Sequence, residues 1–258
     1  MKKIKEIWQY RQMIYGLVHR DLRGRYKSSL LGFLWTFINP LLQLLVYTMV
    51  FSVILRSDID KYYLFLFVAL IPWMFFSSSV AGGCNCVIAH QDMVTKIYFP
   101  REVLPIAHVT TNFVNMLYTF IVVFIVVAFC GVPFSLTAYL CLPVIMIVEY
   151  ILALGLTLIV SSATVYFRDL EHIMGIIVMA WQFLTPIMYK IDLVPESVMP
   201  IFNLNPMTSV INAYRDILYY GRPPQLKTLT TALALGVLFL LAGALIFNRL
   251  QRHFSEEL

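Results

Sequence analysis

Residues 20–27 read RDLRGRYK, and residues 30–55, which follow almost directly (LLGFLWTFINPLLQLLVYTMVFSVIL), contain no charged side chain. A basic segment joined to a long apolar one is typical of a chain that enters a membrane from the cytoplasmic face, because Lys and Arg are retained on that side. The same cations lie where the phosphate of a lipid would lie. Composition alone favours the simplest interpretation, a basic membrane anchor.

The composition places the whole chain in the membrane. Hydrophobic residues make up 60% of its 258 residues and charged residues only 13%, and the mean hydropathy is +0.79. A soluble globule of this size needs more polar surface, so we expect an all-α integral membrane protein. The net charge of +5 then reflects topology and surface anchoring, and no basic domain stands clear for nucleic acid. Cys84 and Cys86 are two residues apart, which on a helix points them in different directions, and no His or second pair completes a metal site, so no metal is expected.

Apolar runs define the membrane topology. A helix needs roughly 20 residues to cross the hydrocarbon core, and six runs qualify. They lie near residues 30–55, 62–89, 106–130, 136–165, 173–189 and 228–247. We therefore expect two regions, a cytoplasmic amphipathic helix within residues 1–29 and a six-helix membrane domain over residues 30–258.

The distribution of basic residues gives the orientation. Six crossings place both termini on one side, and with that side in the cytoplasm 13 of the 19 Lys and Arg residues lie inside. Because basic residues are enriched in short cytoplasmic loops, the sequence predicts that the N-terminus and the C-terminus both face the cytoplasm.

Two loops differ from simple connections. In the cytoplasmic loop of residues 90–105, Tyr98 and Phe99 are large rings flanked by charge, so they need either the bilayer surface or another protein as a partner. The outer segment of residues 190–227 is rich in proline and holds apolar stretches, 198–204 and 207–218, that are too short to cross. These stretches predict re-entrant helices that form an outer gate, with an ordinary outer cap as the alternative.

One charge and several rings fall inside the spans. Glu149 lies about midway along the fourth span, where it is either a hydrogen-bonded contact between helices or part of a polar path. Aromatic residues near span ends suit interfacial belts, but a path for sugars could use the same rings, because ring faces stack on the C–H faces of pyranoses. Candidates for such a lining are Trp35, Trp73, Phe76 and Tyr118.

Motifs for chemistry are missing from the sequence. It contains no G-x-x-x-x-G-K-[ST] phosphate loop, no H-E-x-x-H and no G-x-S-x-G. The chain therefore has no recognisable site for ATP hydrolysis or other catalysis, and we expect no enzymatic activity from it alone.

Four blocks of sequence carry a resemblance. They are residues 20–35 together with Asn39-Pro40, residues 96–105 (KIYFPREVLP), residues 167–170 (FRDL) and residues 205–207 (NPM). Together they resemble the permease subunit of type-2 ABC exporters, in the branch that exports cell-surface polysaccharides, and the likeness covers essentially the whole chain. The blocks are specific for the family but are shared by permeases for O-antigen, capsule, rhamnose-rich polymers and teichoic acids.

The resemblance implies a working assembly and roles for particular residues. In this family two permeases form a homodimeric pore in the bacterial cytoplasmic membrane, and two separate ATPase subunits bind ATP and Mg, so this chain would bind no cofactor. A coupling loop would contact the ATPase, and basic residues would meet the phosphate of a lipid-linked glycan where it enters. The coupling residues would be Lys96, Ile97, Tyr98, Phe99, Pro100, Arg101 and Glu102, and the entrance residues Arg20, Arg23, Arg25, Tyr26 and Lys27.

Three alternatives remain at this point. A type-2 exporter of drugs, lipids or small molecules would share the fold. A membrane transferase acting on polyprenyl phosphates would need grouped acidic residues, whereas Asp21, Asp92, Glu102, Asp169 and Glu171 are scattered over three segments. A secondary transporter would show internal repeats or paired charges within the membrane, and the sequence has neither.

Overall fold

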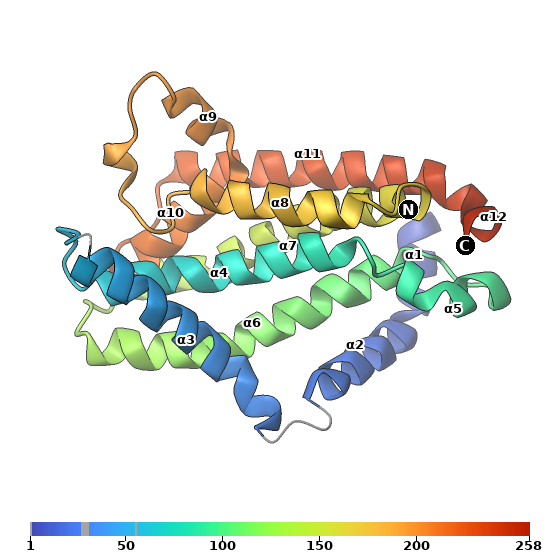
Figure 1. Ribbon diagram of the computed structural model, residues 1–258, viewed down its shortest axis with the longest axis horizontal. Coiled ribbons are helices and arrows are strands. Elements are labelled where there is room, and N and C mark those ends of the chain that lie inside the picture. The colour runs from blue at the N-terminus through green and yellow to red at the C-terminus, as the bar shows by residue number, and fades with distance from the viewer. Residues whose placement is uncertain (1, 27–30, 55) are drawn as a thin grey trace.

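The computed structural model describes residues 2–26, 31–54 and 56–258, and these residues form helices and turns without a strand. Five helical segments are long and apolar enough to cross a membrane, and Figure 1 shows most of them running side by side. They are Gly32–Ile54, Tyr62–Gly83 (α4), Val103–Phe129 (α6), Leu136–Tyr166 (α7) and Leu226–His253, which contains α11 (Leu226–Leu250). The first segment joins η1 (Gly32–Leu34), α3 (Trp35–Thr48) and η2 (Met49–Ile54).

The fifth predicted span is shorter in the structure than in the sequence pattern. Residues 173–189 were expected to cross, but the helix here, α8 (Leu170–Phe183), has 14 residues. At 1.5 Å per residue it is about 21 Å long, which is less than the hydrocarbon core. The helix ends three residues before Pro186, whose ring would clash with the preceding turn of a continuing helix.

The N-terminal region is two helices rather than one. The helix is interrupted at Tyr10, which forms a turn between α1 (Lys2–Gln9) and α2 (Arg11–Tyr26). α2 packs against α6, with Leu17 and Val18 buried in the contact region, and in Figure 1 it runs obliquely to the bundle. Apolar side chains thus hold α2 to protein over part of its length, whereas the sequence suggested a helix resting on lipid alone.

α7 is the central helix of the bundle. It packs most extensively against α11 and also contacts α4, α6, α8 and α10 (Pro206–Leu218). The close approach to α11 depends on Gly155 and Gly243, because a Cβ atom on either would overlap backbone atoms of the other helix. Small residues at a crossing let two membrane helices bring their backbones together.

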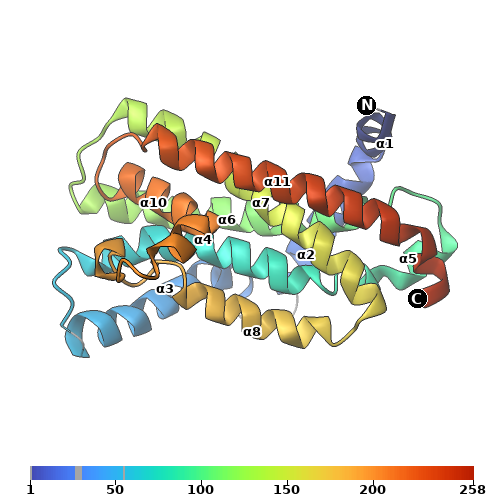
Figure 2. The same ribbon diagram turned by 90° about the horizontal axis from the view of Figure 1, so that it is seen from above.

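α10 is a short helix that packs among the long helices of the bundle. It contacts α4, α7 and α11, and eleven of its 13 residues are buried. Figure 2 shows it between α11 and α4, toward the end of the bundle opposite the one that carries α1, α5 (Gln91–Lys96) and α12 (Phe254–Glu257). In contrast to α10, the segment that contains α3 is almost entirely unburied within the chain.

The glycine crossing generates a direct test. Gly155→Ala should lower the free energy of unfolding by roughly 1–3 kcal/mol, because the added methyl group overpacks the α7–α11 contact. Gly175→Ala, on α8 with no atom within 4 Å of the new methyl, is the matched control, and it should be neutral or stabilising by up to about 1 kcal/mol through helix propensity. Thermal unfolding of the purified chain, followed by circular dichroism, compares the two. Equal melting temperatures for the two variants would contradict the close crossing.

Candidate functional site

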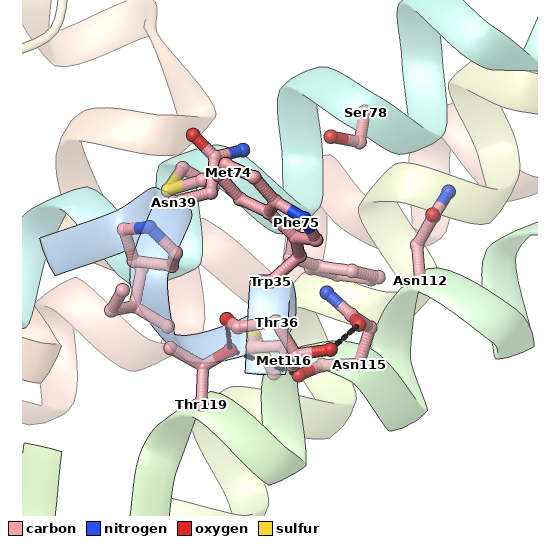
Figure 3. A pocket seen from close by; sticks show the side chains of 12 residues that line it. Trp35, Thr36, Asn39, Met74, Phe75, Ser78, Asn112, Asn115, Met116 and Thr119 are labelled. Atoms are coloured by element: carbon pink, nitrogen blue, oxygen red, sulfur yellow. Dashed lines mark hydrogen bonds between the residues drawn. The ribbon is translucent and has the colours of Figure 1, made fainter. Parts of the chain in front are cut away.

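A polar cavity opens between α3, α4 and α6, within the segments that can span a membrane. Its volume is about 350 Å³, and Figure 3 shows amide and hydroxyl side chains from all three helices around it. The polar lining residues are Thr36, Asn39, Ser78, Asn112, Asn115 and Thr119, and Trp35, Pro40, Ile71, Met74, Phe75 and Met116 complete the wall.

Hydrogen bonds fix part of this lining. The Thr36 hydroxyl donates to Oδ1 of Asn115 at 3.4 Å, and the Thr119 hydroxyl donates to the Thr36 carbonyl at 3.3 Å. Asn112 lies one helical turn from His108, with Nδ2 3.2 Å from the ring Nε2. Polar groups gathered at membrane depth are costly against lipid and are tolerated where they line a wet cavity or face protein. The cavity is therefore suited to water and hydroxylated molecules.

The four predicted aromatic residues divide into two pairs. Trp35 lines the cavity, and Tyr118 packs edge-to-face against Phe33 at 5.1 Å on the exposed side of α6. Trp73 and Phe76 are instead buried in the core, 5.6 Å apart, and Phe76 packs against Trp181 of α8. Only Trp35 and Tyr118 therefore lie on the open face of this chain.

Glu149 is buried away from the cavity. Its Oε2 accepts a hydrogen bond from the Tyr214 hydroxyl at 2.7 Å, which links α7 to α10, and its Oε1 has no partner among the described residues. Within this chain the carboxyl group is a contact between helices and does not line the α3–α4–α6 cavity.

The predicted coupling residues begin at the last residue of a short helix, α5, and continue as a loop. α5 ends at Lys96, whose ammonium group pairs with Asp92 at 2.8 Å and lowers the pKa of that carboxyl. Beyond it Tyr98 is 86% exposed, whereas Phe99 is 5% exposed and belongs to an apolar cluster at this end of the bundle. Of the two rings expected to meet a partner, only Tyr98 is available on the surface of this chain.

The C-terminal segment, which the sequence did not single out, binds this same loop. Arg101 donates to the carbonyl of Gln251, and the Gln251 side chain donates to Glu102 at 2.8 Å. Glu102 also pairs with Lys3 of α1, and the Arg101 guanidinium lies over the ring of the fully buried Phe254. Phe254 was the available signal, since it is a lone aromatic residue in an otherwise polar tail.

The cations predicted to line the entrance differ in their surroundings. Arg20 contacts the ring of His90, which ends η3 (Ile88–His90), and pairs with Asp21 at 3.4 Å. Arg23 is exposed and forms no salt bridge with another described residue. For Arg25 and Tyr26 the structure gives the helical backbone of α2, and Lys27 lies outside the described residues.

The thiol of Cys86, beside the Arg20–His90 contact, is buried. Cys86 follows α4, and its carbonyl lies 2.9 Å from Nδ1 of His90. Burial raises the pKa of Cys86 to about 12, so the thiol stays protonated at neutral pH. The thiolate is the reactive form of cysteine, so this burial disfavours reaction at the Cys86 sulfur.

Asn205 holds the predicted outer gate together. It lies between α9 (Met199–Leu204) and α10, and its Oδ1 accepts from the backbone of Met207 and from the indole of Trp181 at 3.0 and 2.9 Å. Its Nδ2 donates to Thr185 at 2.9 Å and to the Leu184 carbonyl. One side chain thus caps α10 and ties it to the end of α8.

The helical bundle with its apolar spans defines a multi-pass membrane protein, and comparison with known sequences gives its family. The profile of the ABC-2 type transporter family matches residues 12–219. The chain therefore belongs to the ABC-2 type transporters, as its sequence blocks indicated. It is a membrane-spanning permease of the bacterial inner membrane, and in such systems the ATPase is a separate protein.

Individual relatives extend over most of the chain. It is 35% identical over 260 residues to the O-antigen export system permease protein RfbA of Myxococcus xanthus, covering 100% of both chains. It is 33% identical over 246 residues to the protein of the same name from Klebsiella pneumoniae, covering 95% of each. The polysialic acid transport protein KpsM of Escherichia coli is 24% identical over 214 residues, covering 81% of each.

Proposed function

We propose that this permease moves a lipid-linked polysaccharide out of the inner leaflet, as a homodimer driven by two copies of a separate ATP-binding subunit. The amide-lined cavity at membrane depth carries the proposal, since a path for hydroxylated cargo needs neutral donors and acceptors where lipid would forbid them. The names of the relatives support the same cargo class, because O-antigen and polysialic acid are both polysaccharides.

The proposed topology has six crossings with both termini in the cytoplasm. α8 completes its crossing through residues 184–189, where Ile187 and Met188 are buried and the Tyr62 hydroxyl donates to the Met188 carbonyl at 2.9 Å. Irregular backbone is acceptable at such depth when it is buried in protein. In this orientation α1, α5 and α12 face the cytoplasm, residues 1–29 hold the entrance helix, and α9 with α10 forms the outer gate.

A second copy completes the path. α3 carries Asn39 at the cavity, yet its span is almost entirely unburied within one chain. Packing α3 against a second copy would remove its apolar surface from lipid and place the two polar cavities at a shared axis. Trp35 and Tyr118, on the same open side, would then offer ring faces to sugars.

Asn39→Leu tests the cargo path. Removing an amide from the cavity wall should reduce polysaccharide export about five-fold, the effect of one lost neutral hydrogen bond, while the melting temperature stays unchanged because Asn39 is exposed in the single chain. Surface polysaccharide in cells that produce the transporter with its ATPase is the measurement. Thr230→Leu, an exposed polar-to-apolar change on α11 outside the cavity, is the control, and equal export by the two variants would contradict the assignment.

Tyr98→Ala tests the coupling contact. An exposed aromatic anchor contributes roughly 2 kcal/mol to an interface, so the affinity for the ATPase subunit should fall about thirty-fold without loss of stability. Phe99→Ala should instead lower the free energy of unfolding by roughly 3–5 kcal/mol, because this ring is buried. Co-purification with the ATPase and thermal unfolding separate the two effects. Tyr15→Ala, which removes another largely exposed ring, on α2, should retain binding, and a Tyr98→Ala variant that also does so would refute the contact.

Arg23→Gln tests the entrance. We propose that Arg23 binds the phosphate of the lipid carrier, since it is exposed and forms no salt bridge with another described residue, whereas Arg20, which is also exposed, contacts His90 and Asp21. The cargo concentration that half-stimulates ATPase activity should rise about ten-fold, the effect of one lost charge-assisted contact. Arg11→Gln, at the other end of α2, should leave this concentration unchanged. If both variants match the unsubstituted protein, the strip is only an anchor.

A further inference from the structure

A second polar cavity lies at the opposite end of the bundle from α5 and α12. It has a volume of about 340 Å³ and is formed by the start of α4, η4 (Ile191–Leu193), α10 and the approach to α11. Five charged side chains line it, namely Lys190, Asp192, Arg215, Asp216 and Arg222. In the proposed orientation this cavity opens at the outer surface, well away from the cytoplasmic entrance.

Arg215 is the unusual member of this group. Its side chain is 4% exposed, its guanidinium carbon lies 3.6 Å from the centre of the Phe65 ring, and it donates to the Ile187 carbonyl at 2.6 Å. Its Nε has no hydrogen-bond partner among the described residues, and none of their carboxylates forms a salt bridge with it. A buried cation without a counter-ion is costly, so an anion that enters the cavity would be favoured.

The other charged residues that line the cavity do not neutralise Arg215. Asp216 is the nearest acidic residue in sequence, but Arg222 binds it with two nitrogens, each at 2.7 Å. Asp192 lies exposed on η4, and Lys190 is exposed beside it. The lining therefore holds three cations against two carboxylates, one of which is already neutralised.

We propose that this cavity binds a phosphate group at the outer surface of the membrane, with Arg215 and Lys190 as its principal contacts. The planar guanidinium presents parallel donors that match phosphate oxygens, and the ammonium group adds a mobile second charge. The phosphate comes from one of two sources, the headgroup of an anionic phospholipid in the outer leaflet or the diphosphate of a polyprenyl carrier after transport. The site follows from the charges of this chain, whatever the exported cargo is.

Binding is measured with the full-length chain and its ATPase subunit in phosphatidylcholine nanodiscs without ATP. Phosphatidylglycerol in the disc and added farnesyl diphosphate are the two probes, and the dissociation constant of each is followed through the melting temperature. Every variant also carries Arg23→Gln, which removes the proposed cytoplasmic contact. Lys190→Gln should weaken binding about ten-fold, and Arg215→Lys should weaken it while retaining the charge. Lys227→Gln, an exposed outer lysine that does not line the cavity, should change it by less than about two-fold.

The two probes separate the sources. Binding of phosphatidylglycerol alone supports the lipid headgroup, binding of farnesyl diphosphate alone supports the carrier, and binding of both supports a general phosphate site. Absence of binding by either probe overturns the proposal, as do equal constants for Lys190→Gln and Lys227→Gln. Export is not part of the measurement, so failure here leaves the proposed transport function intact.

Discussion

The close packing of α7 against α11 is the contact on which the remaining arrangement depends. Because Gly155 and Gly243 carry no side chain, the two backbones approach until neither accepts even a methyl group. α4, α6 and α10 then pack around α7 in this helix pair. α3 and α8 remain at the edge, with most of their apolar surface free. A rigid centre and a loosely covered edge suit a protein whose moving parts and partner contacts lie at its periphery.

Polar groups within the bundle fall into two kinds. Glu149 with Tyr214, and Asn205 with Trp181, pair with each other across helices and so fix α10 between its neighbours. The amides and hydroxyls around Asn39 line open space. Lipid penalises both kinds unless each has a partner. The first kind stabilises the fold. The second kind also holds hydrogen bonds, such as that between Thr36 and Asn115, but it surrounds open space and so indicates where water or cargo replaces lipid.

Hydropathy predicted the long spans well because a run of about 20 apolar residues has few other uses. It predicted too long a helix at α8, where apolar residues continue to Tyr189 but the helix ends at Phe183, three residues before Pro186. The burial of Trp73 and Phe76 could not be predicted either, since in a helix that is apolar on all sides periodicity does not tell the protein face from the lipid face. Phe99 lies in the loop between α5 and α6, where no helical periodicity indicates which side chain is buried. The contact of Arg101 and Glu102 with Gln251 joins residues about 150 positions apart, and no local pattern carries such information.

α6 connects the two surfaces on which the proposed function relies. It begins at Val103, directly after the loop that α1 and the C-terminal segment hold through Glu102 and Arg101. Asn112 and Asn115 lie on this same helix, about 14 and 18 Å further along its axis at 1.5 Å per residue. α2, which carries Arg23, the proposed entrance contact, packs on it as well. If the loop is the proposed contact with the ATPase subunit, its displacement would move the proposed entrance helix and the cavity wall together, because both are attached to the same helix, α6.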